Sequence, residues 1–223
     1  MFEQHFYHGS MRKLVVAFGS LFNEIYISRK NADGTEDKKI KVPITYSPKE
    51  KFYRKVIELD QASSERKAVE NVLPRMAFEI TSMTYDTTRK LNSLNKVFVT
   101  KDEQDKTFSY SYHEVPYTIE FNLNIMTRNI DDGYQIVEQI LPYFTPEFTI
   151  TMNFNEIYRK IDVPIVLNNI SSSEDYEGNL NEDRRMIMHT LSFSAKSYIL
   201  GPVRQGGLIR EIKLTFKELT DEP

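Results

Sequence analysis

The sequence lacks cysteine and long apolar runs, and each absence excludes a class of protein. Without cysteine the chain can form no disulfide, no thiolate metal site and no thiol nucleophile, and this composition suits assembly in a reducing cytoplasm. No apolar run approaches the ~20 residues of a membrane-spanning helix, and the N-terminal region lacks the apolar core of a signal peptide. We therefore expect a protein that has no membrane partner.

The motifs of common enzymes are absent as well. There is no Gly-x-x-x-x-Gly-Lys phosphate loop, no Gly-x-Gly-x-x-Gly fingerprint and no nucleophile elbow. His5 and His8 have no third histidine or acidic partner nearby, and His189 falls on the apolar face of a strand, where a hydrogen-bonded core histidine is expected. We therefore expect no catalytic residue, no metal and no cofactor. The alternative is an enzymatic or small-molecule-binding domain, which would show a ligand-filled cleft.

What is present describes an ordinary globular protein. Hydrophobic residues make up 40% of the 223 positions and charged residues 27%, and the length fits one domain over residues 1–223 that buries roughly 70% of its unfolded surface. The chain has 13 Tyr and 14 Phe, which are favoured anchors of protein interfaces. Most of them fall on strand or helix faces that a core would claim first. Residue chemistry alone indicates a non-enzymatic interaction protein.

Charge is unevenly distributed along the chain. The net charge of −3 argues against direct nucleic-acid binding. Residues 11–55 nevertheless hold eleven Lys and Arg against five Asp and Glu, a net +6, which leaves −9 for the remainder. Lys38, Lys39 and Lys41 flank a predicted Asp33-Gly34 turn and are the candidate protein interface. The basic segment is either a solvated face or a docking surface for an acidic partner or another copy.

The middle of the chain predicts a strand–helix–strand unit. Apolar residues alternate with polar ones from Tyr117 to Ile125 and again from Phe148 to Phe154, a period of two. Between them Asn129 should cap a helix that Asp131 and Asp132 stabilise and that Pro142 ends. The predicted apolar stripe of this helix consists of Ile130, Tyr134, Val137, Leu141 and Phe144, widened by Ile136 and Ile140. We expect it to be a core helix.

The remaining elements are predicted from caps, turns and alternation. Ser10 should cap a helix to about Asn23, inside which Gly19 hints at close packing. A hairpin of residues 25–29 and 38–46 places Pro43 at a sheet edge or bulge. Two short helices follow between residues 47 and 74, and later come a strand bent near Ile80, a hairpin of residues 97–112, and strands at 161–167, 187–195 and 212–216. Residues 171–183, with Gly206 and Gly207, should form loops. About eight strands and three or four helices predict an α+β domain with a mostly antiparallel or mixed sheet.

Several stretches together resemble a known family. They are Phe6-Tyr7, Met11-Arg12, Gly19 with Leu21-Phe22, Lys41-Val42-Pro43-Ile44-Thr45-Tyr46, Val72-Leu73-Pro74-Arg75, Thr127-Arg128, Asp131-Asp132, residues 135–144 with Pro142 and Phe144, Arg184-Arg185 before Leu191-Ser192-Phe193, and residues 207–210. In order and approximate spacing the chain resembles the tail sheath stabiliser and completion family of T-even-like contractile-tailed bacteriophages. The central block is the most specific of these stretches.

The resemblance implies a structural virion protein that is not an enzyme. Members of the family form a homohexameric ring at the head-proximal end of the tail, at the junction of tail and neck. There they cap the sheath and contact the tail sheath protein, the tail-tube terminator and the neck or head-completion proteins. Assembly would take place in the host cytoplasm. The alternative within the virion is a tail-tube terminator or a head–tail connector, which would also form a ring.

Overall fold

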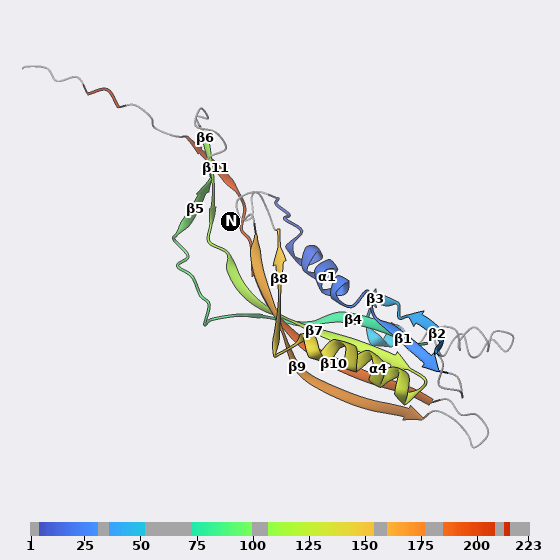
Figure 1. Ribbon diagram of the computed structural model, residues 1–223. Helices are drawn as coiled ribbons and strands as arrows, with labels where there is room; N and C mark the ends of the chain where they lie inside the picture. Colours follow the sequence, from blue (N-terminus) through green and yellow to red (C-terminus); the bar gives the residue numbers. More distant parts are fainter. Residues whose placement is uncertain are drawn as a thin grey trace, which may run out of the picture.

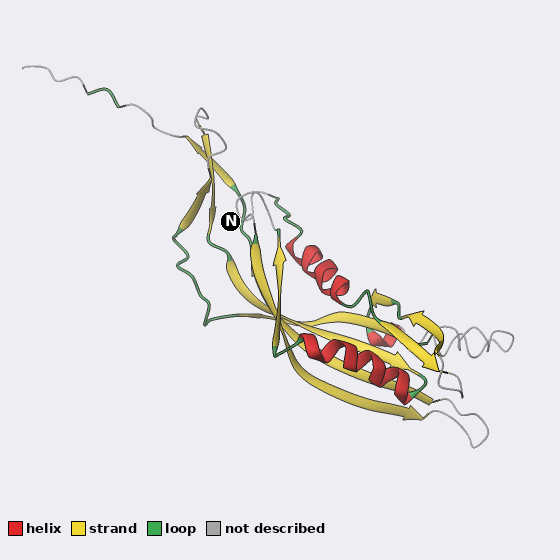
Figure 2. Ribbon diagram, in the orientation of Figure 1, coloured by secondary structure: helices red, strands yellow, loops and turns green. Residues whose placement is uncertain are grey.

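The computed structural model describes residues 5–30, 36–51, 73–99, 107–153, 160–176, 185–207 and 212–214. Within these ranges the chain is mainly β (Figure 2). A six-stranded sheet has the order β3-β4-β7-β10-β9-β8, a hairpin pairs β1 with β2, and a three-stranded sheet has the order β11-β6-β5. The strands are β1 (Tyr26–Lys30), β2 (Glu36–Lys41), β3 (Ile44–Tyr46), β4 (Arg75–Tyr85), β5 (Lys96–Val99), β6 (Thr107–Tyr112), β7 (Val115–Thr127), β8 (Glu147–Met152), β9 (Ile161–Tyr176), β10 (Arg185–Ile199) and β11 (Arg204–Gly207).

The predicted α+β class with three or four helices is therefore wrong. The helical elements that lie wholly within the described residues are α1 (Ser10–Leu21), α4 (Ile130–Ile140) and the short 3₁₀ helix η1 (Leu141–Tyr143), and residues 49–51 are helical as well. The two short helices predicted between residues 47 and 74 fall almost wholly on 52–72, outside the described residues. Strands are longer and more numerous than the alternation predicts, because several polar segments pair with neighbours through their backbones.

One face of the six-stranded sheet carries the core. Ile119, Phe121, Leu123 and Ile125 alternate on β7 and are buried, as predicted, and α1 covers them with Leu14 and Phe18. The rings of Phe18 and Phe121 stack with centroids 4.4 Å apart. A Cβ added at Gly19 would lie 3.0 Å from the Phe78 ring, so the predicted close packing at Gly19 is confirmed. Helix α4 packs its Ile136 and Ile140 into the same cluster.

On the opposite face of the sheet, β7 and β10 pair polar residues along their middle, and Met126 with Met188 near one end. Thr190 Oγ1 donates to Asn124 Oδ1, and Ser192 Oγ donates to Asn122 Oδ1, each at 2.9 Å. These bonds link directly opposed residues of the two strands. Between Ile119 and Ile125 the alternation on β7 thus separates a packed face from a hydrogen-bonded one, whereas Met126 joins Met188 and Ala77 in a small apolar cluster on the second face.

Two N-terminal predictions need correction. The N-cap of α1 is Gly9, in the left-handed conformation with φ 66°, and not Ser10; glycine adopts this conformation without steric cost. Residues 38–46 are not one strand, since β2 ends at Lys41 and β3 begins at Ile44 in a different sheet, parallel to β4. Pro43 lies at this crossing, where its carbonyl accepts a hydrogen bond of 2.9 Å from Met76 N. The edge position predicted for this segment is confirmed for β3.

The second half of the chain contains three further differences. Ser171 to Tyr176, predicted as loop, extends β9 because these residues pair with Arg185 to Thr190 of β10. Gly206 and Gly207 lie in β11 rather than in a loop, and Gly206 leaves room for the Phe108 ring, which would lie 2.6 Å from an added Cβ. Residues 212–214 form no strand. By contrast, the bend in β4 after Ile80 and the antiparallel pairing of β5 with β6 are confirmed.

The three-stranded sheet lies at the far end of the molecule from the β1–β2 hairpin (Figure 1). Between β4 and β5, Arg89 connects the linker to the main sheet: Arg89 Nη2 donates to the Tyr117 carbonyl at 3.3 Å, and its guanidinium lies 4.9 Å from the Tyr198 ring centroid. Hydrogen bonds from Thr88 and Arg89 hold the pKa of Asp86 well below its usual value. This cluster fixes the start of the linker where the two sheets meet.

Candidate protein-interaction surfaces

The predicted basic interface lies on the β1–β2 hairpin, but its lysines do not share one face. Lys39 and Lys41 pair across the hairpin with Ser28 and Tyr26, and their Nζ atoms lie 4.9 Å and 5.9 Å from the Tyr26 ring centroid. Lys38 pairs with Arg29 and so points to the other face. All three lysines are exposed. Lys41 also reaches Glu24 at 3.4 Å.

Helix α4 covers the free edge of β1 with two glutamine side chains. Gln139 Nε2 donates to the Tyr26 carbonyl at 2.7 Å, while Gln135 Oε1 accepts from Ser28 N at 2.9 Å. An unpaired strand edge invites association with another chain, and here the amide side chains take the place of a neighbouring strand. This edge of the hairpin is thus closed within the molecule.

The acidic motif at the start of α4 has two separate roles. Asp132 is buried and forms an ion pair of 2.9 Å with Arg29 of β1, which fixes the hairpin against the helix. Asp131 is exposed and accepts from Gln135 Nε2 at 3.2 Å. Arg128 is exposed immediately before the helix. Asn129 occupies the predicted N-cap position, although its side chain makes no capping bond.

The remaining family-motif residues are structural or surface positions. Phe144 packs among aromatic rings, with its centroid 5.1 Å from that of Phe193. Pro142 is exposed in η1, which continues α4 by one tighter turn. Pro43 is exposed at the crossing between sheets, and Tyr46 sets its half-exposed ring against Phe78 at 5.3 Å.

His189 is buried under the first turn of α4. Its Nδ1 atom shares a hydrogen bond of 2.6 Å with the Ser172 hydroxyl, whereas Nε2 has no hydrogen-bond partner among the described residues. The Nε2 atom lies 2.5 Å from where a Cβ on Gly133 would be. Burial lowers the pKa of His189, and Glu174 opposes that shift. The predicted core location is confirmed, but the expectation of a fully hydrogen-bonded ring is met at one nitrogen only.

An apolar pocket of about 490 Å³ opens between the ends of α1 and α4, and we call it the acid-rimmed pocket. Its lining residues are Leu21, Phe22, Glu24, Ile25, Glu138, Gln139, Ile140, Pro142, Tyr143, Phe144 and Phe148. Glu24 and Glu138 are both exposed, and Tyr143 is 68% exposed. The pocket therefore offers apolar surface to a partner beside two carboxylates.

The three-stranded sheet carries a second apolar surface, which we call the aromatic face. Its members are Phe98, Phe108, Tyr110 and Tyr112. Register places them on one side of the sheet, since Phe98 pairs with Tyr110 and the three β6 residues alternate. Ring centroids of Phe98 and Phe108 lie 5.5 Å apart, and those of Phe108 and Tyr110 lie 5.9 Å apart. Phe98 remains 58% exposed.

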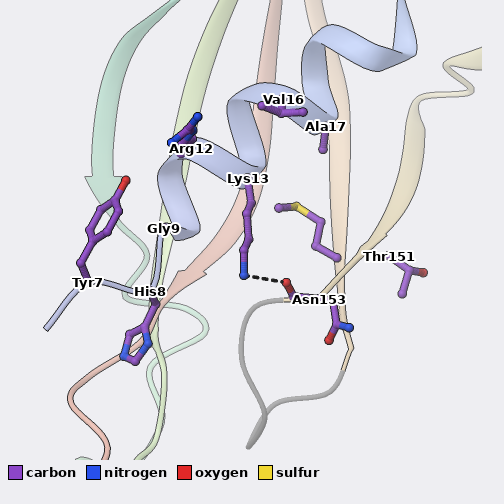
Figure 3. A pocket seen from close by; sticks show the side chains of 10 residues that line it. Tyr7, His8, Gly9, Arg12, Lys13, Val16, Ala17, Thr151 and Asn153 are labelled. Atoms are coloured by element: carbon purple, nitrogen blue, oxygen red, sulfur yellow. Dashed lines mark hydrogen bonds between the residues drawn. The ribbon is translucent and has the colours of Figure 1, made fainter.

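A third hollow, of about 620 Å³, lies beside the start of α1 (Figure 3). Tyr7, His8, Arg12 and Lys13 line it together with Thr151 and Asn153 at the end of β8. Lys13 Nζ crosses it to donate to the Asn153 carbonyl at 3.1 Å, and His8 Nε2 lies 2.8 Å from the Gly201 carbonyl. These bonds tie the N-terminal segment and α1 to the end of the sheet.

Neither metal-binding nor membrane-spanning features occur in the described part of the chain. No three His, Asp or Glu side chains there lie close enough to hold a metal ion. Nor does any helix within the described ranges have the length and apolar character to cross a membrane. The acidic residues 177–183, for which the sequence predicts a solvated loop, fall outside those ranges.

Sequence reasoning missed the aromatic face and the acid-rimmed pocket. It assigned most aromatic residues to a core, whereas Phe98 and Tyr112 are exposed. A signal was available in Phe108, Tyr110 and Tyr112, which alternate with Ser109 and Ser111 in a segment with no predicted helix to cover it. The pocket depends on three elements that meet only in the fold, so no local pattern could reveal it.

Comparison with known proteins identifies similarities over almost the whole chain. The model of the T4-like virus Myoviridae tail sheath stabiliser family matches residues 5–223. The chain is also similar to the tail completion protein gp15 of Enterobacteria phage T4, with 37% identity over 218 residues that cover 95% of this chain and 78% of that protein.

Proposed function

This chain belongs to the T4-like tail sheath stabiliser family, and from that premise we propose that it closes the head-proximal end of a contractile phage tail as a ring. It is a structural protein of the virion, located where tail and neck meet. The observation that carries the proposal is the family match, which runs from residue 5 to residue 223. The single domain predicted over residues 1–223 is part of the same proposal.

The ring is a homohexamer that acts mechanically. One surface holds the last ring of the tail sheath protein, another contacts the tail-tube terminator, and a third receives the neck or head-completion proteins. The protein needs no cofactor and performs no catalysis. Closed rings of identical subunits require heterologous contacts between copies, and exposed apolar and charged surfaces on opposite parts of this molecule support such contacts.

Electron microscopy of tails tests the proposal. Purified protein is added to sheathed tails that lack it and, in parallel, to bare tail tubes. We expect a six-fold ring at the head-proximal end of the sheathed tails and much weaker binding to bare tubes. A protein that remains monomeric at all concentrations and on tails would overturn the ring. Equal binding to bare tubes would instead favour a tube terminator.

A further inference from the structure

Within the described residues nothing covers the aromatic face. Phe98 is 58% exposed and Tyr112 37% exposed, although they belong to one cluster of rings on a sheet of only three strands. Small sheets depend on packing of an apolar face for stability, and exposed aromatic clusters mark interaction sites. Gly206 has no side chain over which the Phe108 ring would have to rise, so that ring lies against the β11 backbone. A partner is therefore expected on this face.

Positive charges flank the aromatic face. Lys96 Nζ lies 4.9 Å from the Tyr110 ring centroid and 5.3 Å from that of Tyr112. Arg204 lies on β11, which pairs with the edge of β6 opposite β5. It is the cross-strand partner of Tyr110 and is exposed. Aromatic side chains and arginine are the residue types that most often anchor protein interfaces. The complementary surface must be an apolar hollow with carboxylates at its rim.

The acid-rimmed pocket meets this description on the same chain. Phe22, Ile140 and Phe144 supply apolar lining, and the carboxylates are Glu138 and Glu24, of which Glu24 also lies 3.4 Å from Lys41 Nζ in an exposed pair. One molecule cannot join the two surfaces, because the three-stranded sheet stands at one end of the structure and the pocket lies beside the main sheet between α1 and α4 (Figure 1). The two surfaces can meet only between copies.

We propose that the aromatic face of one copy docks into the acid-rimmed pocket of the next, with Lys96 and Arg204 facing Glu24 and Glu138. Such a head-to-tail contact uses two different surfaces, and contacts of this type form a ring when the rotation between copies closes. The inference rests on the proposed function, for which it identifies the subunit contact. Phe98 is the anchor, because it is the most exposed ring of the face.

The absence of cysteine allows a direct test. Tyr112→Cys and Tyr143→Cys place one thiol on each surface and keep the Phe98 anchor, and both positions are exposed. Under mild oxidation the doubly substituted chain should give a ladder of disulfide-linked species up to the ring size, while each single variant should give none. Disulfide-linked dimers of the Tyr112→Cys variant alone would show face-to-face docking and overturn the proposal. A cross-link from the Tyr112→Cys variant to another tail protein would also overturn it.

Charge reversal gives an independent readout by analytical ultracentrifugation. Lys96→Glu and Glu138→Lys should each weaken assembly, and the variant with both changes should recover it. Phe98→Ala should raise the apparent dissociation constant about thirty-fold, as loss of an interface anchor does. Leu94→Ala, at a 79% exposed residue before β5, is the matched control and should have no effect. Melting temperatures confirm that each variant is folded.

The experiments distinguish failure of the proposed subunit contact from failure of the proposed function. Wild-type rings on tails combined with unaffected Phe98→Ala and no cross-linked ladder would overturn this contact and leave the proposed function intact. Folded single charge variants that dissociate, without recovery in the double variant, would also overturn the pairing. A wild-type protein that never forms rings on tails would overturn the proposed function together with the contact.

Discussion

Gly133 lies at a point where α4 packs closely on the sheet. An added Cβ would lie 2.5 Å from His189 Nε2 and 3.2 Å from Thr127 Oγ1. The imidazole cannot move aside freely, since it is buried and hydrogen-bonded to Ser172. Overpacking of this kind costs about 1–3 kcal/mol and outweighs the gain of about 1 kcal/mol that alanine brings to a helix.

We therefore expect Gly133→Ala to lower the melting temperature by several degrees, on the order of 2–4 °C per kcal/mol for a chain of this size. The matched control is Gly201→Ala, where an added Cβ meets no atom within 4 Å. Combining Gly133→Ala with His189→Ala should remove the clash. If Gly133→Ala melts at the wild-type temperature, the close packing at this point is not real.

His189 should make the protein sensitive to acid. Burial lowers its pKa in the folded chain, whereas the unfolded histidine titrates near 6.5. As pH falls below about 6.5 the unfolded state binds more protons than the folded state, so the free energy of unfolding decreases. Glu174, Ser172, Thr127 and the first turn of α4 surround the ring and do not reverse this sign.

Urea unfolding at pH 7.5 and pH 5.5 measures the effect. We expect wild type to lose more stability on acidification than His189→Gln, which removes the titrating group. His5→Gln, at an exposed histidine, is the control and should behave as wild type. Identical pH dependence in wild type and His189→Gln would contradict the argument.

At the scale of elements, helix α4 shows where sequence patterning succeeds and fails. The helix and its approximate end are predicted correctly, but its buried face is rotated from the predicted stripe. Ile136 and Ile140 are buried, whereas Tyr134 is 55% exposed and Leu141 is partly buried. The pattern counted apolar residues without knowing that Asp132 turns inward to meet Arg29. A partner distant in sequence thus set the orientation of the helix.

Stability of alanine variants tests the corrected face. Ile136→Ala should cost about 2–5 kcal/mol through lost burial and a cavity. Leu141→Ala should cost less because its side chain is only partly buried, and Glu138→Ala should stay within about 0.5 kcal/mol. Chemical unfolding of the three variants gives these values directly. A larger loss for Leu141→Ala than for Ile136→Ala would restore the originally predicted face.

The other elements show the same difference: the sequence predicts features that depend on neighbouring residues and misses those that depend on residues far apart in the chain. Alternation predicted β7, β10 and the β5–β6 hairpin because each strand's own side chains separate into two faces. It could not predict that Ser171 to Tyr176 extend β9, since these polar residues gain their partners from β10. The change of sheet at Pro43 and the cover that Gln135 and Gln139 provide for β1 depend on elements far apart in the chain.

At the scale of the whole molecule, the basic hairpin remains a predicted contact with tail partners. Lys38→Glu with Lys39→Glu leaves the Lys41–Glu24 pair in place and should leave the melting temperature nearly unchanged, because exposed charges contribute little to stability. Attachment to tails, scored by electron microscopy, should fall. Lys90→Glu with Lys196→Glu alters two exposed lysines elsewhere by the same charge and is the control. If both variants attach to tails equally well, the contact with tail partners does not involve this hairpin.

The continuity of strands between the two sheets has a mechanical consequence. Three lengths of chain join the small sheet to the large one: the linker from β4 to β5, the two residues between β6 and β7, and the segment from β10 to β11. β7 and β10 are in register over thirteen residue pairs, with their hydrogen bonds perpendicular to the strands. Both strands lead to the small sheet from the same end, since Val115 pairs with Ile199, so tension that enters there runs along the two strands in parallel and does not open their hydrogen bonds one after another. The molecule is built to resist pulling along this ribbon, the direction in which its two ends would be drawn apart.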